Sequence, residues 1–151
     1  MKALVEQAGP NARAGSAEEE VAASEVLLMA TPWPATRAVV EGLGPLAGKI
    51  LIDATDPILP RLAGKEFANT TSGAEQVAGW KAGARVVKAF NTVGFNVMAE
   101  PDFGGEASTL FYRGDDAEAK QVAKQQATEL GFSAEDGGPL TRVRVLEPFA
   151  L

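Results

Sequence analysis

Short apolar runs and longer stretches with helical periodicity alternate along the chain. An unbroken apolar run of four or five residues is typical of a strand that is covered on both faces of a parallel sheet. Two such runs lie at 26–30 and 50–52, and Val86–Val87 opens a third strand at 85–89. Two further strands are predicted at 108–112 and 132–135.

Helix-start signals fall between these runs. Ser16–Glu19 and Ser72–Glu75 each fit a capping box, and the second helix is expected to continue through Trp80. Another helix is expected after Pro34, with the apolar positions Ala35, Ala38, Val39 and Leu43. A further helix is expected to be capped by Asp115 or Asp116 and closed by Gly131. Its apolar stripe consists of Ala119, Val122, Ala123, Ala127 and Leu130.

The remaining segments carry weaker signals. Met1–Ala8 is expected to form one or two helical turns, Asn11–Ala14 a short strand, and Val93–Ala99 a turn or short helix, while 58–71 is expected to be a loop. Strands that alternate with helices predict βαβ units, so the expected fold is an α/β domain with a mostly parallel sheet and helices on both faces. Residues 1–151 are expected to form one domain.

Composition narrows the chemistry. The chain of 151 residues contains neither cysteine nor histidine, which excludes disulfides, thiolate or histidine metal sites and histidine-dependent nucleophilic catalysis. A net charge of −6 without a visible basic face argues against nucleic acid and anionic membranes as partners. No apolar run is long enough to span a bilayer and no secretory signal is visible, so a cytoplasmic protein is expected.

Small polar residues follow three of the predicted strands, at 30–33, 53–57 and 88–92. In an open parallel sheet, ligands bind beyond the carboxyl ends of the strands. Neighbouring strands would bring these ends together as a floor of backbone amides, hydroxyls and the Asn91 side chain, suited to a flat, neutral, polar ring. The alternative is that these Thr and Asn side chains only bond to the backbone of their own turns.

Several side chains in and near this floor leave two interpretations open. Asp53 and Asp56 fit either a magnesium site or turn caps. Trp33 would stack on a ligand ring or cover the sheet, and Lys88 would attract a phosphate or extend its ammonium group out of the core. The acidic group Asp115, Asp116 and Glu118 fits a metal site less well than a helix N-terminus.

A phosphate-binding glycine loop is not found in the required context. Residues 42–47, GLGPLA, match G-x-G-x-x-G/A literally. They follow a predicted helix and precede a strand, whereas the motif must follow a strand and open a helix. The segment is therefore interpreted as a helix stop.

Taken in order, a set of segments resembles the deazaflavin-dependent NADP oxidoreductase family, and also the cytoplasmic domain of the six-transmembrane metalloreductases. The segments are ATPWP, GPLAGKILIDATDP, SGAEQVAGW, ARVVKAFNTVG, DFGG, YRGDDAEAK, ELGF and DGGPL. The resemblance implies a Rossmann domain that binds NADP(H), whose nicotinamide exchanges hydride with a flavin or deazaflavin ring. It places Thr31, Pro32, Trp33, Ala54, Thr55, Ala89, Phe90, Asn91 and Thr92 along the cofactor, and implies no catalytic side chain and no metal ligand.

The chain departs from the family at its start. Family members begin with a strand, a glycine-rich turn, a helix and a second strand, and the first residues here resemble the stretch after that unit. The expectation is therefore a truncated Rossmann-like domain with weak NADP(H) binding. The strand at 26–30 would become an open edge, which we expect a second copy of the chain or a rearranged N-terminal segment to cover. The alternative function is a non-catalytic remnant that serves as a small binding or oligomerisation module.

Overall fold

The computed structural model describes residues 2–58 and 70–150. Its sheet has five strands in the order β1-β2-β3-β4-β5, which is also their order along the chain. The strands are β1 (Val26–Met29), β2 (Ile50–Asp53), β3 (Arg85–Lys88), β4 (Thr109–Gly114) and β5 (Ser133–Asp136). All pairings are parallel except the one between β3 and β4. The predicted α/β, Rossmann-like architecture is confirmed, and each of the five predicted strands is present.

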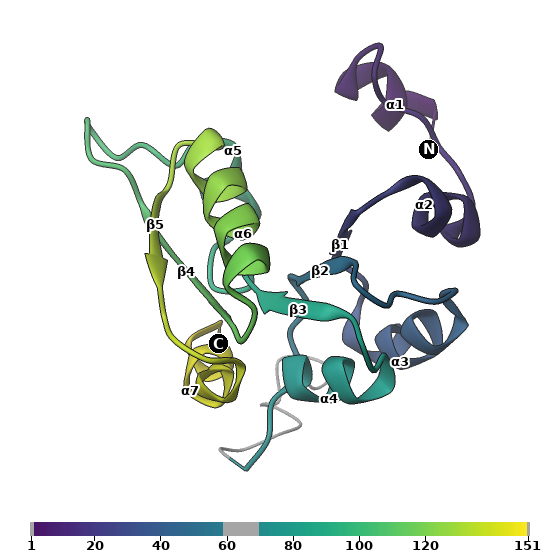
Figure 1. The fold of residues 1–151 in the computed structure, drawn as a ribbon. Helices are drawn as coiled ribbons and strands as arrows, with labels where there is room; N and C mark the ends of the chain where they lie inside the picture. The colour runs from purple at the N-terminus through teal and green to yellow at the C-terminus, as the bar shows by residue number, and fades with distance from the viewer. Residues whose placement is uncertain (1, 59–69, 151) are drawn as a thin grey trace.

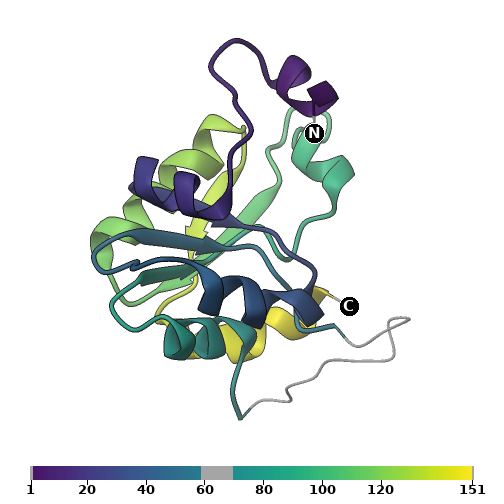
Figure 2. The same cartoon turned by 90° about the vertical axis from the view of Figure 1, so that its right-hand side faces the viewer.

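Helices cover both faces of the sheet (Figures 1 and 2). They are α1 (Lys2–Ala8), α2 (Ala17–Ala23), α3 (Trp33–Gly42), α4 (Gly73–Trp80), α5 (Phe95–Ala99), α6 (Ala117–Glu129) and α7 (Val143–Leu146), with 3₁₀ turns at Leu140–Arg142 and Glu147–Ala150. On one face α6 packs over β3, β4 and β5, and on the other α3, α4 and the C-terminal segment lie side by side. None of the described helices combines the length and hydrophobicity that a membrane crossing requires.

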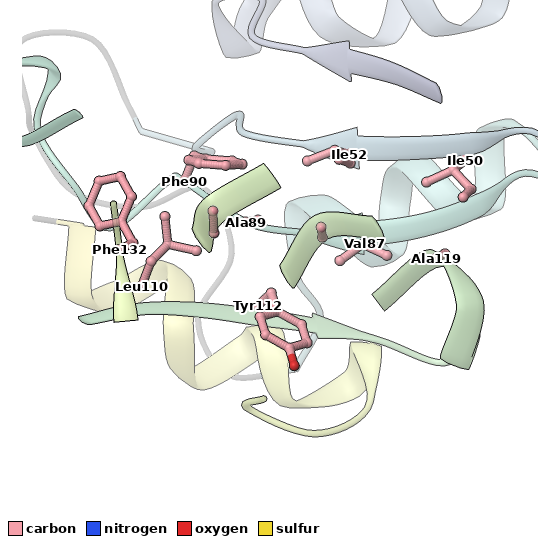
Figure 3. Packing of buried hydrophobic residues seen from close by; sticks show 11 residues of the cluster. Ile50, Ile52, Val87, Ala89, Phe90, Leu110, Tyr112, Ala119 and Phe132 are labelled. Carbon is pink, nitrogen blue, oxygen red and sulfur yellow. The ribbon is translucent and has the colours of Figure 1, made fainter. Parts of the chain in front are cut away.

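The α6 face owes its close packing to alanine. Ala119, Ala123 and Ala127 are fully buried, and they belong to the same hydrophobic cluster as Ile52 and Val87 of the central strands, part of which Figure 3 shows. Asp116 caps this helix through its bond to the amide of Ala119, as one of the two sequence alternatives requires. Gly131 ends it with a φ of 95°, a conformation that glycine adopts without strain.

Three expectations about burial and pairing are wrong. β1 is not covered on both faces, since Leu28 is 61% exposed. The buried side of α3 is formed by Thr36 and Val40, whereas Ala35 and Ala38 are exposed and Val39 is only partly buried. Asn11–Ala14 is not a strand, because no neighbouring strand offers it a backbone ladder. The expected loop at 58–71 lies mostly outside the described residues.

We expect Ala123→Leu to destabilise the fold by about 1–3 kcal/mol, because the larger side chain must displace the sheet from α6. Urea unfolding followed by circular dichroism measures the effect as a lower midpoint. Gln121→Leu, on the exposed side of the same helix, is the control and should leave the midpoint nearly unchanged. Equal midpoints for the two variants would contradict close packing at Ala123.

Candidate nucleotide site and the buried ion cluster

The three predicted strand ends are neighbours in the structure. The amide of Ala54 donates to the carbonyl of Met29 at 2.9 Å, and the amide of Ala89 donates to the carbonyl of Asp53 at 3.2 Å. These bonds extend the β1–β2 and β2–β3 ladders by one residue. The residues that follow β1, β2 and β3 therefore form one continuous surface, which we call the strand-end floor (Thr31–Trp33, Ala54–Thr55 and Ala89–Thr92).

Next to this floor lies a cavity of about 460 Å³ on the α6 side of the sheet. We call it the apolar cavity. Of the predicted site residues, Ala54 and Phe90 line it. Its other lining residues come from β1 and its end, from α5, and from the end of α6: Leu28, Ala30, Met98, Gln126, Glu129 and Leu130. The cavity is large enough for a small organic ring, because ligand pockets span about 300–1,000 Å³.

The turn after β3 has two features that packing alone does not explain. Phe90 has a φ of 68°, in the left-handed region that non-glycine residues rarely occupy. Such a backbone costs about 1–3 kcal/mol and is found preferentially at binding and active sites. The next residue, Asn91, has a buried side-chain amide whose Nδ2 and Oδ1 both lack a hydrogen-bond partner. An orphaned buried amide is a donor–acceptor pair available to a ligand.

Two of the three hydroxyl groups of the floor, those of Thr31 and Thr55, are already used by the protein. The Thr31 and Thr36 hydroxyls bond to each other at 2.9 Å, and Thr55 bonds to the Asp53 carboxylate at 2.7 Å. Ala89 is fully buried in the core beside α6. For Thr31 and Thr55, the alternative that such side chains stabilise their own turns is what the structure shows.

Trp33 stacks on a protein ring. Its indole lies 5.7 Å from that of Trp80, at an interplanar angle of 30°, and the guanidinium of Arg37 lies 5.6 Å from the Trp80 ring centre. Pro32 precedes α3 as its N-cap residue. Of the two interpretations of Trp33, the structure supports a structural role that joins α3 to α4.

Thr92 belongs to a different hollow. With Thr109, Phe111, Arg113, Leu146 and Phe149 it lines a cavity of about 310 Å³. We call this the Arg113 cavity. It shares no lining residue with the apolar cavity. The turn 90–92 therefore contributes to two hollows, through Phe90 to one and through Thr92 to the other.

Below the floor lies a fully buried ion cluster. The ammonium group of Lys88 lies 3.0 Å from Asp53 Oδ2 and 3.1 Å from Glu147 Oε1, and it also donates to the carbonyl of Thr55. Burial lowers the pKa of Lys88, but the two carboxylates outweigh it and hold this pKa above its ordinary value. Both sequence interpretations of Lys88 are wrong: its charge neither reaches solvent nor faces a phosphate.

Glu147 connects this cluster to the start of α4. Its Oε2 accepts from the amide of Gly73 at 2.9 Å and its Oε1 from the amide of Ala74 at 3.2 Å. Burial raises the pKa of Glu147, and Lys88 and the two amides offset this only in part. Two carboxylates share one ammonium group, so the buried cluster carries an excess of negative charge that the N-terminus of α4 partly compensates.

The two metal interpretations find no support in the described residues. Asp53 is a partner of Lys88 and Thr55, and Asp116 caps α6. Asp115 accepts from the amide of Leu140 at 2.9 Å. Within the described ranges, no cluster of three or more acidic side chains is arranged to hold a metal ion.

Sequence reasoning did not assign a role to Glu147. The available signal was that a charged residue ends each of three apolar runs, at Asp53, Lys88 and Glu147. A charge in such a position is rarely buried unless it is paired. That rule would have indicated an internal cluster, although it could not have shown which charges meet.

Comparison with known proteins agrees with this geometry. Residues 1–57 match the model of the family described as coenzyme F420-dependent NADP oxidoreductase. The metalloreductase STEAP3 of Rattus norvegicus is 30% identical over 134 residues, which make up 89% of this chain and 26% of that protein.

Two solved structures are similar in sequence as well as in fold. A candidate F420-dependent NADP reductase from Arthrobacter sp. FB24 superimposes with a TM-score of 0.81 at 30% identity, over 88% of this chain and 63% of that one. The hypothetical protein SMa0349 from Sinorhizobium meliloti gives 0.76 at 28% identity, over 84% and 62%. A reductive aminase from Aspergillus terreus, at 18% identity and a TM-score of 0.61, shares the fold.

Fold and strand-end floor thus define a Rossmann-like domain of the type found in NADP-binding reductases. The chain is similar in sequence and fold to NADP-dependent oxidoreductases related to the coenzyme F420-dependent enzymes, in agreement with the sequence resemblance. It spans about a quarter of the length of the curated relative and less than two thirds of the two most similar solved chains described above.

We expect the pH dependence of stability to change in Glu147→Gln. Because the pKa of Glu147 is raised on folding, the folded chain binds a proton more tightly than the unfolded chain. Lowering the pH from neutrality towards 4.5, the ordinary value, should therefore raise the free energy of unfolding of the wild type relative to that of the variant. Urea midpoints of both proteins across this range measure the difference, and parallel curves would contradict a buried, proton-binding Glu147.

Proposed function

We propose that this chain binds NADP(H) over the strand-end floor and supports hydride transfer between the nicotinamide and a flavin or deazaflavin ring. The family relationship supports the cofactor class. The observation that carries the proposal is the orphaned amide of Asn91, in a turn strained at Phe90 and adjoining the apolar cavity.

The residues present fit a nicotinamide. Its carboxamide has an NH₂ group that can donate to Asn91 Oδ1 and a carbonyl oxygen that can accept from Asn91 Nδ2. Its flat ring has apolar faces, which suit a position beside Ala54 and Phe90. When bound, the cofactor itself would supply the hydride chemistry. This chain would bind and orient the ring and would exclude water, with no side chain acting as acid or base.

Of the nine predicted site residues, we propose direct contact with the cofactor for Ala54, Phe90 and Asn91. Thr92, expected along the cofactor, lines the separate Arg113 cavity, so we do not propose a cofactor contact for its side chain. The other five are proposed to act through the backbone or through their support of the floor. Thr31 and Thr55 fix their turns, Ala89 is in the core, and Pro32 and Trp33 set the start of α3. We also retain a cytoplasmic location as a proposal.

A non-catalytic binding module is the second candidate. The observation in its favour is that no described residues form a strand, glycine turn and helix of the kind that holds a pyrophosphate. Residues 42–47 begin at Gly42, the last residue of α3, and include its C-cap Leu43, as expected for a helix stop. The NADPH titration described next separates the two candidates.

We expect Asn91→Leu to weaken NADPH binding about tenfold, the loss expected for one or two hydrogen bonds of about 0.5–1.5 kcal/mol each. The same substitution should raise the urea midpoint of the free chain, because it removes two buried polar atoms without partners. NADPH fluorescence titrations and urea unfolding measure the two effects.

Asn96→Leu serves as the control, since Asn96 is an exposed amide on α5, and it should change neither quantity. If NADPH shows no saturation at millimolar concentration with the wild type, the proposed function is wrong for this chain and the binding-module candidate replaces it. If NADPH binds but Asn91→Leu binds it equally well, the role of Asn91 is wrong.

We further propose that β1 pairs with a second copy of the chain. Among the described strands β1 has only β2 as a neighbour, so its other edge has no strand beside it, and neither α1 nor residues 9–15 form one there. An uncovered strand edge beside an exposed leucine favours association with another chain.

Leu28→Lys should shift the chain from dimer towards monomer, because an exposed lysine on an edge strand disfavours pairing with another chain. Sedimentation velocity at several protein concentrations measures this. Leu4→Lys, at an equally exposed leucine on α1, is the matched control and should leave the dimer intact. A wild-type chain that sediments as a monomer at every concentration would rule out the dimer.

A further inference from the structure

The Arg113 cavity has the features of a second ligand site. It lies on the face of β4 opposite to α6, because Thr109, Phe111 and Arg113 alternate with the buried Leu110 and Tyr112. The C-terminal segment closes its other side with Leu146 and Phe149. Its volume of about 310 Å³ is at the lower end of the range for small-molecule pockets.

Arg113 brings a positive charge without a counterion to this cavity. Its Nε donates to the carbonyl of Gly137 and its Nη1 to the carbonyl of Arg142, both at 2.9 Å, and both acceptors are neutral. No carboxylate among the described residues forms an ion pair with it, and its Nη2 has no partner there. Burial and the nearby charge of Arg142 lower the pKa of Arg113.

The rest of the lining is aromatic and hydroxylic. Phe149 is 77% exposed and Phe111 is 42% exposed, an unusual amount of aromatic surface at the mouth of one small cavity. Thr92 and Thr109 add hydroxyl groups for which no hydrogen bond is found among the described residues. Aromatic faces select a flat apolar ring, and a half-buried guanidinium with a free Nη2 selects a carboxylate or phosphate.

We propose that the Arg113 cavity binds a small aromatic anion, with the ring between Phe111 and Phe149 and the acidic group on Arg113. This site is separate from the apolar cavity and does not depend on NADP(H) binding. Thr92 lines it one residue after Asn91, so a bound anion would lie close to the turn of the strand-end floor.

The test uses three probes with the same ring: naphthalene-2-carboxylate, 2-naphthyl phosphate and the neutral naphthalene-2-methanol. Each is titrated into the ¹⁵N-labelled chain without nucleotide, and amide shifts are followed by NMR. We expect at least one of the anions to bind about tenfold more tightly than the alcohol, with shifts at Thr92, Thr109 and Phe149. The two anions distinguish a carboxylate ligand from a phosphate ligand.

Variants assign the effect to the cavity. Arg113→Met should abolish the preference for the anions, while Arg113→Lys should retain part of it. Since Arg113 also holds two carbonyls, Phe149→Ala gives a second test that leaves those bonds in place, and it should weaken all three probes. Phe95→Ala, at an 87% exposed ring on α5, is the control and should change nothing.

The proposal is overturned if the alcohol binds as tightly as both anions, if the shifts centre on Leu28 and Met98 of the apolar cavity, or if none of the probes binds at millimolar concentration. Because NADPH is absent from this titration, its outcome is independent of the Asn91 experiment.

Discussion

The buried group of Lys88, Asp53 and Glu147 joins β2 and β3 to a C-terminal segment that lies far from them in sequence. Lys88 ends β3, Asp53 ends β2, and Glu147 brings the C-terminal segment onto the N-terminus of α4. Removing one member of such a cluster costs about 3–5 kcal/mol, because an uncompensated charge then stays buried. Replacing a whole buried ion cluster with apolar side chains is often neutral or stabilising. The contribution of this cluster is therefore to fix the positions of the segments that it joins, rather than to add stability. It fixes where the strand-end turns begin, and the floor is built on those turns.

The site follows from this arrangement one residue at a time. Lys88 is fixed at the carboxyl end of β3, and the amide of Ala89 continues the hydrogen-bond ladder to β2. At the next residue, Phe90, the backbone changes direction with a φ of 68°. That turn leaves the amide of Asn91 buried and unpaired. Strain and an orphaned amide both reduce stability, and a protein retains them where they contribute to binding. The ion cluster thus stabilises the backbone conformation that the strained turn 90–92 requires.

Local patterns predicted the elements well and their surroundings poorly. The capping box at Ser16, the Asp116 cap and the alanine stripe of α6 depend on neighbours a few residues away, and all are present. The exposure of Leu28, the buried face of α3 and the partners of Lys88 depend on residues distant in sequence, and these expectations failed. An apolar run does not reveal whether something covers it, and a lysine does not reveal which carboxylates it will meet. Glu147 is 59 positions beyond Lys88, so no local window connects them.

The two hollows beside the turn 90–92 differ in ways that the backbone explains. β3 and β4 run antiparallel, and Lys88 at the end of β3 pairs with Arg113 near the end of β4. The turn that follows β3 therefore runs back towards the start of β4, and its side chains can point to either face of the sheet. Phe90 contributes to the α6 face, where the lining is apolar, and Thr92 contributes to the opposite face, where Arg113 lies. A ligand in one hollow would restrict the turn that forms a wall of the other. Coupling of this kind needs only that the turn have two arrangements of similar energy, and a backbone held at an unfavourable φ is the segment most able to supply them.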